Sequence, residues 1–243
     1  MSIQVIINGA LGRMGQVTVK TIQQEPHFNL IAETQTTHEL KNAMLSNKVD
    51  IAIDFTHARA VYKNTKSIIL ADVHPVIGTS GLHPQQIKEL QTLCAEKKLG
   101  GIIAPNFCIG ALLMMRLAEQ AAHYFSECEI IETHHEKKLD APSATALKTA
   151  ELLSAARKTQ PSTKKIHETI PRARGALKNK IPIHALRLPG FLAKQEILFG
   201  HPGGNLTISH ETIDRNAYMP GVLLACKKVM ALKKLVYGLE TFL

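Results

Sequence analysis

A short apolar segment followed by a glycine-rich loop opens the chain and limits its possible folds more than any other feature. Residues 3–7 are mostly β-branched and apolar, which predicts a buried parallel strand. The loop Gly9-Ala10-Leu11-Gly12-Arg13-Met14-Gly15 follows, and a helical pattern then continues to Gln24. A second strand is predicted from Phe28 to Glu33. This order of strand, glycine loop, helix and strand predicts a βαβ unit that binds a dinucleotide.

The glycine spacing is G-x-x-G-x-x-G, which serves the same physical ends as the commoner G-x-G-x-x-G. The first glycine permits a tight turn, the second lets backbone N–H groups approach a pyrophosphate, and the third lets the helix pack closely on the strand. Arg13 adds a cation beside the phosphates. Glu33 ends the second strand, where a carboxylate can accept hydrogen bonds from the adenosine ribose. The alternative for the loop is a structural turn, and its surroundings favour the cofactor.

The α/β alternation continues to residue 104. Helices are expected at residues 37–46, 57–70 and 83–98, and strands at 49–55, 75–78 and 101–104. In a doubly wound sheet, ligands bind beyond the carboxyl ends of the strands. The segments 55–56, 78–80 and 104–107 should therefore line one crevice, although ordinary loop chemistry is the alternative for Asn106 and Phe107.

The second half of the chain changes character. We expect a helix at 109–124, a strand at 129–133, a helix at 143–157, a basic excursion at 158–182, strands at 183–188, 195–199 and 206–211, and a final helix at 217–237. The fold predicted is α/β, with an N-terminal Rossmann-like dinucleotide-binding domain and a smaller α+β substrate and oligomerisation domain with an open mixed sheet. The domains predicted are 1–106 with 216–243, and 107–215.

The stretch from Glu129 to Leu147 gathers the chemistry. Two histidines and two lysines, His134, His135, Lys137 and Lys138, stand between a strand and the start of a helix. Histidine, with an ordinary pKa of about 6.5, can donate a proton near neutrality, and a lysine can bind a carboxylate or protonate a nitrogen. A helix N-terminus follows, and its N–H groups favour an anion. The loop therefore combines an acid, a cation and an anion cradle.

Each of these residues also has an ordinary alternative. A histidine beside a strand end is often structural, and Lys137 is expected to be solvated. Metal binding by His134 and His135 is not expected, because neighbours on an extended chain point apart. Asp140 and Ser143 are both expected to be helix caps.

The composition excludes several classes of protein. The 243 residues carry 29 Lys and Arg against 20 Asp and Glu, a net charge of +9, which either attracts anions or marks a solvated basic surface. Aromatic residues make up only 5% and Trp is absent, which argues against a surface that stacks nucleic-acid bases. The four cysteines form no C-x-x-C pair, and no apolar run is long enough to span a bilayer. A cytoplasmic protein without a metal, nucleic-acid or membrane partner is expected.

Several motifs occur in an order that resembles the dihydrodipicolinate reductase family. They are Gly9-x-x-Gly12-Arg13-Met14-Gly15, Ile53-Asp54-Phe55-Thr56, Ile77-Gly78-Thr79-Ser80-Gly81, Asn106-Phe107, and Glu132-x-His134-His135-x-x-Lys138-x-Asp140-Ala141-Pro142-Ser143-x-Thr145-Ala146-Leu147. The resemblance spans almost the whole chain, and the His-His…Lys…Asp-Ala-Pro-Ser segment is its most specific part.

The resemblance implies a homotetrameric enzyme that uses NADH or NADPH to reduce 4-hydroxy-tetrahydrodipicolinate (dihydrodipicolinate) to tetrahydrodipicolinate, in the diaminopimelate route to lysine. It implies that His134 donates or accepts a proton and that Lys138 donates one. His135, Ala144 and Thr145 match the positions that bind the substrate carboxylates. The positions that match the cofactor site are Gly9, Ala10, Leu11, Gly12, Arg13, Met14, Glu33, Gly78, Thr79, Ser80, Ala104, Pro105, Asn106, Phe107, Arg215 and Tyr218.

The chain departs from the family at two of these places. Ala144 replaces a common glycine, which is tolerable in an anion cradle if its φ is negative. Thr34 stands after Glu33 where some members carry an arginine for the 2′-phosphate of NADPH. This difference favours NADH, while Arg13 and the basic balance leave NADPH open.

Two other functions remain compatible with parts of the sequence. Another two-domain dehydrogenase, such as one acting on amino acids, would share the cofactor fold, although the His-His…Lys loop argues against it. A nucleotide sensor or a basic nucleic-acid-binding protein would fit the charge of +9, but no recognised nucleic-acid motif is present.

Overall fold

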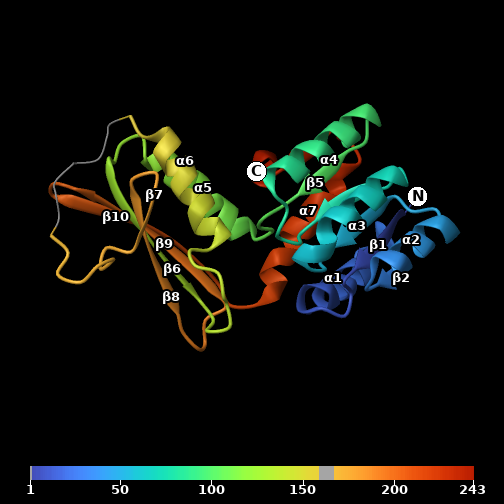
Figure 1. The fold of residues 1–243 in the computed structure, drawn as a ribbon, viewed down its shortest axis with the longest axis horizontal. Coiled ribbons are helices and arrows are strands. Elements are labelled where there is room, and N and C mark those ends of the chain that lie inside the picture. The colour runs from blue at the N-terminus through green and yellow to red at the C-terminus, as the bar shows by residue number, and fades with distance from the viewer. Residues whose placement is uncertain (1, 159–166) are drawn as a thin grey trace. The chain divides into compact units, whose positions relative to one another are not determined.

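The computed structural model describes residues 2–158 and 167–243. It divides into two compact units, Met1–Cys108 with Arg215–Leu243, and Ile109–Asp214 (Figure 1). Of the basic excursion predicted at 158–182, residues 159–166 lie outside the described part. Within the described ranges, no helix combines the length and apolar character that a membrane crossing needs.

A six-stranded parallel sheet forms the centre of the first unit. Its strands are β1 (Ile3–Asn8), β2 (Phe28–Thr34), β3 (Ile51–Asp54), β4 (His74–Ile77), β5 (Gly101–Ile103) and β11 (Leu235–Tyr237). Their order is β11-β5-β4-β3-β1-β2, so the chain moves outward from β1 to β2 and then returns to place β3 on the other side of β1. This reversal makes the carboxyl ends of β1 and β3 the topological switch point at which such sheets bind ligands.

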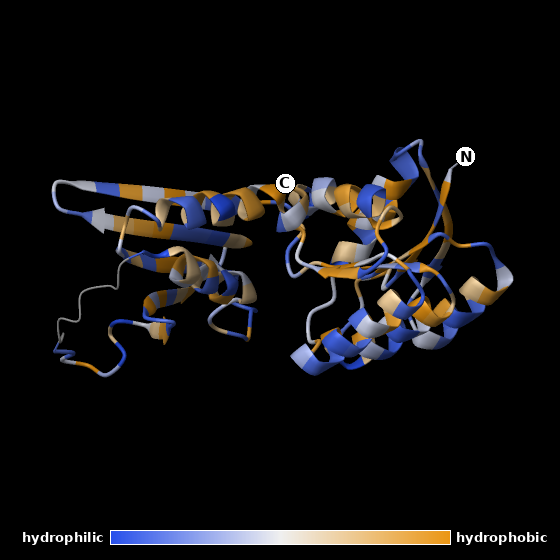
Figure 2. Cartoon of the chain, turned by 90° about the horizontal axis from the view of Figure 1, so that it is seen from above, coloured by the Kyte–Doolittle hydropathy of each residue, from blue (hydrophilic) through white to orange (hydrophobic). Residues whose placement is uncertain are grey.

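Helices enclose this sheet. They are α1 (Arg13–Gln24), α2 (Thr37–Ser46), α3 (Ala58–Leu70), α4 (Pro84–Glu96) and α7 (Met219–Val229), with the 3₁₀ turns η1 (Arg215–Tyr218) and η2 (Glu240–Phe242). The helix α3 contacts α2 and α4, whereas α1 contacts α7. Figure 2 shows apolar strands between helices whose outer residues are hydrophilic, as a two-sided α/β core requires. The predicted Rossmann-like fold is confirmed.

A mixed five-stranded sheet forms the second unit. Its strands are β6 (Glu127–His134), β7 (Ala176–Lys178), β8 (Ile181–Arg187), β9 (Ala193–His201) and β10 (Gly204–Thr212), in the order β10-β9-β6-β8-β7. Only β6 and β8 pair in parallel. The helices α5 (Ile109–Ala121) and α6 (Ala144–Ala156) pack on the sheet through a core that includes Met115, Ala150 and Phe199. The predicted open mixed sheet is confirmed.

Two elements differ from the sequence prediction. The helix predicted at 217–237 is wrong: α7 ends at Val229, and Leu235–Tyr237 instead pairs in parallel with β5 as an edge strand. The strand β7 was not predicted. It joins β8 through Asn179 and Lys180, whose φ angles of 50° and 64° are those of a type I′ hairpin turn. Asn-Lys lacks the glycine that usually announces such a turn.

Candidate functional site

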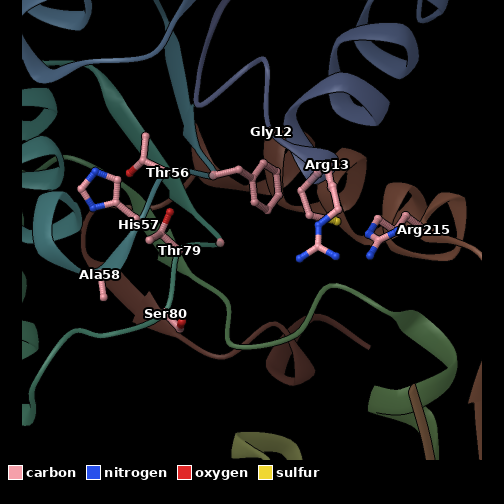
Figure 3. Close-up of a pocket in the computed structure, with 11 residues that line it drawn as sticks. Gly12, Arg13, Thr56, His57, Ala58, Thr79, Ser80 and Arg215 are labelled. Atoms are coloured by element: carbon pink, nitrogen blue, oxygen red, sulfur yellow. The ribbon is translucent and has the colours of Figure 1, made fainter. Parts of the chain in front are cut away.

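The first candidate site is a cavity of about 330 Å³ at the switch point of the parallel sheet. Three loops that follow β1, β3 and β4 meet there, together with the start of η1. The residues that line the cavity are Gly12, Arg13, Met14, Phe55, Thr56, His57, Ala58, Gly78, Thr79, Ser80 and Arg215 (Figure 3). All of them belong to the first unit. Of the three segments expected to line one crevice, 55–56 and 78–80 line this cavity, whereas 104–107 does not.

A buried carboxylate ties the walls of this cavity together. Asp54 is 0% exposed and accepts hydrogen bonds from Asn8 Nδ2 at 2.9 Å and Asn64 Nδ2 at 2.8 Å. It also accepts from the Thr56 hydroxyl at 2.7 Å and from the Thr79 hydroxyl at 2.6 Å. Because Thr56 and Thr79 line the cavity from different loops, this one side chain fixes the loops after β3 and β4 relative to each other.

The glycines of the loops allow a close approach that a side chain would block. Gly9 has a φ of +84°, and a Cβ added there would lie 2.5 Å from the Phe55 carbonyl oxygen. A Cβ on Gly15 would overlap the Gly9 carbonyl oxygen, and one on Gly78 would overlap the Phe55 ring. The backbone cradle therefore depends on the glycines, which fits a site that receives a pyrophosphate against main-chain N–H groups.

Two arginines give the cavity its charge. Arg13 is the first residue of α1 and Arg215 the first of η1, and both line the cavity. In Figure 3 they lie at the same end of it, while His57 and Thr56 lie toward the other. Guanidinium groups beside a helix N-terminus favour a phosphate-bearing ligand.

The remaining residues predicted for the cofactor lie in the same unit but do not line this cavity. Gly9 and Ala10 lie beneath it and donate their N–H groups to the Thr34 carbonyl oxygen. Leu11 and Glu33 are exposed. Phe107 is buried and packs edge-on against the lining residue Phe55, with ring centroids 5.7 Å apart. The other members of this group are Ala104 and Pro105 after β5, Asn106, whose Oδ1 accepts from the Cys108 N–H, and Tyr218 at the end of η1.

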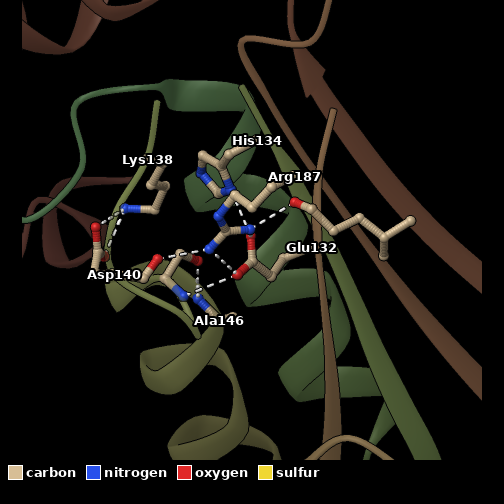
Figure 4. Close-up of polar contacts among 8 residues, drawn as sticks. Glu132, His134, Lys138, Asp140, Ala146 and Arg187 are labelled. Atoms are coloured by element: carbon tan, nitrogen blue, oxygen red, sulfur yellow. Dashed lines mark hydrogen bonds and ion pairs between the residues drawn. The ribbon is translucent and has the colours of Figure 1, made fainter. Parts of the chain in front are cut away.

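The second candidate site is the loop between β6 and α6 in the other unit (Figure 4). His134 ends β6, and its Nδ1 lies 2.5 Å from Glu132 Oε2. Arg187, at the end of the neighbouring strand β8, donates to both oxygens of Glu132 at 3.0 and 2.9 Å. The backbone N–H of Ser143 also donates to Glu132, at 3.1 Å. The buried carboxylate of Glu132 thus contacts His134, Arg187 and Ser143, the residue before the first turn of α6.

The electrostatics keep Glu132 ionised. Burial alone would raise the pKa of this carboxyl, but the hydrogen bonds from His134 and Arg187 and their charges outweigh it and hold the pKa below its usual value. An ionised carboxylate only accepts hydrogen bonds. The Nδ1 atom of His134 is therefore the donor in this contact, and Nε2 is the nitrogen available for proton transfer.

Lys138 and Asp140 form an ion pair in the same loop. The Lys138 ammonium lies 2.7 and 2.6 Å from the two carboxylate oxygens of Asp140. The expectation that Asp140 caps the helix is therefore wrong, because its side chain is committed to Lys138. Ser143 is the N-cap of α6, and its hydroxyl accepts from the Ala146 N–H at 3.2 Å. Lys137 is exposed.

The residues predicted for substrate carboxylates flank the same loop. His135 directly follows β6, and Ala144 and Thr145 form the first turn of α6. Ala144 is helical and is not among the residues with a positive φ, so the methyl group meets no backbone strain there. The loop thus brings His134, His135, Lys138 and the start of α6 into one region.

Four further residues belong to these sites without having been assigned a role from the sequence. His57 and Ala58 line the cavity because α3 begins there. Glu132 could have been found, since a residue two positions before His134 on a strand points to the same face. Arg187 is 55 residues from Glu132 in sequence, and no local pattern marks it.

Comparison with known proteins accounts for the whole chain. The family described as dihydrodipicolinate reductase, N-terminus, matches residues 3–107, and its C-terminus counterpart matches residues 110–243. The 4-hydroxy-tetrahydrodipicolinate reductases of Legionella pneumophila (strain Corby) and Coxiella burnetii (strain Dugway 5J108-111) are 51% and 48% identical, covering 100% of both chains. A dipicolinate-bound dihydrodipicolinate reductase from Paenisporosarcina sp. TG-14 has a similar structure, with 38% identity, a TM-score of 0.87 and 100% coverage of both chains.

Proposed function

The chain belongs to the dihydrodipicolinate reductase family, and we propose on that basis that it reduces 4-hydroxy-tetrahydrodipicolinate (dihydrodipicolinate) to tetrahydrodipicolinate with NADH or NADPH. The observation that carries this function is the 51% identity to a curated reductase over all 243 residues. The reaction belongs to diaminopimelate and lysine biosynthesis.

The first unit is the dinucleotide-binding domain of this proposal. The tight packing at Gly9, Gly12 and Gly78 would let the pyrophosphate approach the first turn of α1, with Arg13 and Arg215 as its cations. Glu33 would bind the adenosine ribose, and the segment 104–107 would contact the nicotinamide end. When bound, the dinucleotide supplies the hydride. The protein's own task is to hold that ligand in one orientation and to exclude water around it.

His134 and Lys138 would move the protons of the reaction. The contact with Glu132 leaves Nε2 of His134 to donate or accept a proton at the substrate. Lys138 provides an ammonium group held at 2.6–2.7 Å by Asp140, and it would protonate the substrate after hydride arrival. Lys137, which is exposed, is assigned no role.

The second unit would bind the substrate. A cyclic dicarboxylate needs hydrogen-bond donors and a positive potential, and His135 together with the first turn of α6, Ala144 and Thr145, offers them. The relative from Paenisporosarcina is described as dipicolinate bound, and dipicolinate is a planar aromatic dicarboxylate of this class. In this proposal, residues 1–106 and 216–243 form the dinucleotide-binding domain, and residues 107–215 form the domain for substrate binding and oligomerisation.

A homotetramer in the cytoplasm completes the proposal. Both helices of the second unit, α5 and α6, pack on one face of its five-stranded sheet through a common core. On β9 the alternate residue Leu198 is 39% exposed, while its neighbours Ile197 and Phe199 are buried. A second copy of the sheet could cover that face. All four cysteines lie in the described residues, are buried and form no disulfide, which fits a reducing compartment.

The decisive experiment follows the absorbance of NADH and of NADPH while the purified protein acts on freshly made dihydrodipicolinate synthase product. Oxidation of either dinucleotide that requires this substrate is the expected result. Protein that binds a dinucleotide but leaves both unoxidised would refute the function. Comparing the two rates gives the cofactor preference, for which Thr34 in place of an arginine favours NADH. Light scattering under the same conditions tests the tetramer.

A further inference from the structure

We propose that Glu132 and Arg187 are positioning residues of this reductase, which hold His134 in a single tautomer and orientation for proton transfer. The inference deepens the proposed role of His134 and rests on it. Neither Glu132 nor Arg187 needs to touch the substrate, because both act through the imidazole and through the loop that carries it.

Both oxygens of the Glu132 carboxylate accept hydrogen bonds. The residue is 0% exposed, and its Oε2 atom faces His134 Nδ1 at 2.5 Å and Arg187 Nη1 at 3.0 Å. Its Oε1 atom faces Arg187 Nη2 at 2.9 Å and the Ser143 N–H at 3.1 Å. Four donors from three elements therefore converge on one buried group, which leaves it a single conformation (Figure 4).

The contact with Glu132 selects one tautomer of the His134 imidazole. A carboxylate accepts but does not donate, so the contact fixes the proton of His134 on Nδ1 and leaves Nε2 as the reactive nitrogen. A neutral histidine without such a partner divides between two tautomers, only one of which can accept a proton at Nε2. The carboxylate also stabilises the imidazolium form that arises when Nε2 gains a proton.

Arg187 connects Glu132 to the loop that carries Lys138. Its guanidinium donates to both oxygens of Glu132 and also, at 2.7 Å, to the backbone carbonyl oxygen of Asp140. Asp140 in turn holds Lys138. Arg187 therefore links the histidine end of the loop to the lysine end, so that a single ion pair sets the relative position of both proton-transfer groups.

The charged groups around His134 come from its own strand, from β8, from β9 and from the loop. On the face of β6 that carries His134 the charge is Glu132, and on β8 it is Arg187. The loop carries the pair of Lys138 and Asp140, together with Glu136 and Lys137. On the neighbouring strand β9, Ala193 is the register partner of His134, whereas Lys194 lies opposite Thr133 and pairs with Glu196 at 3.2 Å. Glu132 is the charged group that contacts the imidazole directly, at 2.5 Å from Nδ1.

The chain offers a matched control on the same strand. Glu129 lies three residues before Glu132, so it points to the opposite face of β6. It also stands between a histidine and an arginine: His184 Nε2 lies 2.7 Å away, and Arg174 pairs with its other oxygen. Glu129→Gln therefore removes the same kind of carboxylate from the same strand, outside the proposed active site.

The test combines nitrogen NMR of histidine with steady-state kinetics. Protein labelled with ¹⁵N-histidine is examined by long-range ¹H–¹⁵N correlation, and the signal of His134 is identified by its loss in His134→Gln. In the wild type we expect the Nδ1–H tautomer alone. In Glu132→Gln we expect a mixture of tautomers, a kcat lower by about 10- to 100-fold, the range for outer partners that orient a histidine, and an unchanged KM for the dinucleotide. Glu129→Gln should leave kcat within about 2-fold.

Several outcomes would overturn the assignment. A wild-type His134 in the Nε2–H form would refute it without any variant, even if Glu132→Gln failed to fold. An unchanged tautomer and kcat in Glu132→Gln would also refute it, as would equal losses in Glu132→Gln and Glu129→Gln. Glu132→Asp, which keeps the charge, should recover part of the kcat that Glu132→Gln loses. A protein without turnover would refute the proposed function, yet the tautomer measurement would still decide the contact.

Discussion

Lys138 donates to both carboxylate oxygens of Asp140, at 2.7 Å from Oδ1 and 2.6 Å from Oδ2. Burial would raise the pKa of this carboxyl, but the hydrogen bond and charge of Lys138 hold it below its usual value. Asp140 is 64% exposed at its side chain and Lys138 only 20%, so the carboxylate reaches in from the solvent side to hold the ammonium. The pair therefore fixes the position of the ammonium, and with so exposed a carboxylate it contributes little to the stability of the fold.

Removing the ammonium should abolish most of the turnover. Lys138→Ala is expected to lower kcat by about 100-fold or more, which is the scale of a lost general acid. Lys137→Ala, the same change at the exposed neighbour, is expected to leave kcat unchanged. Both variants should keep the wild-type melting temperature, measured by circular dichroism. Equal kcat values for the two variants would remove Lys138 from the mechanism.

Neutralising Asp140 should have a smaller effect than removing Lys138. Asp140→Asn keeps an acceptor oxygen but loses the charge that holds the ammonium in place, so kcat is expected to fall by up to about 10-fold. Because the side chain is largely exposed, the free energy of unfolding should barely change. Steady-state kinetics and urea unfolding separate the two effects, and a large loss of stability with normal kcat would contradict the orienting role.

The cavity of the first unit should bind the dinucleotide largely through charge. Arg13→Ala is expected to raise the Kd for NADH by about 10- to 150-fold, since a charged hydrogen bond to phosphate contributes about 1.5–3 kcal/mol. The affinity of the wild type should also weaken with added salt, and that of Arg13→Ala less so. Lys20→Ala removes the same charge from an exposed position on α1 and is the control. NADH fluorescence reports binding without interference, because the chain has no Trp.

Acid should weaken the second unit through Glu132. Its pKa is lowered on folding, so the stabilising interaction is fully present above the ordinary value of 4.5 and is lost as the pH falls through the lower folded value. The free energy of unfolding of the wild type should therefore decrease as the pH falls below 4.5. In Glu132→Gln this decrease should be shallower. Urea titrations between pH 7 and the acid limit measure both slopes, and equal slopes in the two proteins would contradict this role of Glu132.

The sequence predicted well those elements whose signals are local. The helix expected at 37–46 has the same bounds in the structure because Thr36 and Glu39 form a capping box at its start. The glycine loop and its flanking strands likewise need only neighbouring residues. The motif also placed His134, Lys138 and the start of α6 around one loop, because these residues are neighbours in the sequence.

Non-local contacts could not be read in the same way. Whether Leu235–Tyr237 continues a helix or joins a sheet depends on the free edge of β5, which lies far away in the sequence. The helical pattern therefore overran the strand β11. Asp140 resembled a helix cap because aspartate serves both as a cap and as the partner of a lysine. The side chain of Lys138 decides between these two, since it lies within hydrogen-bond distance of Asp140. Arg187 depends on the parallel pairing of β8 with β6.

Close packing in the glycine loop gives a last prediction, which concerns both stability and binding. A Cβ at Gly15 would overlap the Gly9 carbonyl oxygen, and backbone cannot move aside as a flexible side chain can. Gly15→Ala is therefore expected to destabilise the protein by about 1–3 kcal/mol and to weaken NADH binding, because α1 must shift away from β1. In Gly204→Ala the added methyl meets nothing within 4 Å, so stability and binding should stay as in the wild type. Urea unfolding and NADH titration of both variants decide the matter: a Gly15→Ala protein as stable as Gly204→Ala would mean that α1 does not rest on the loop as closely as the cradle requires.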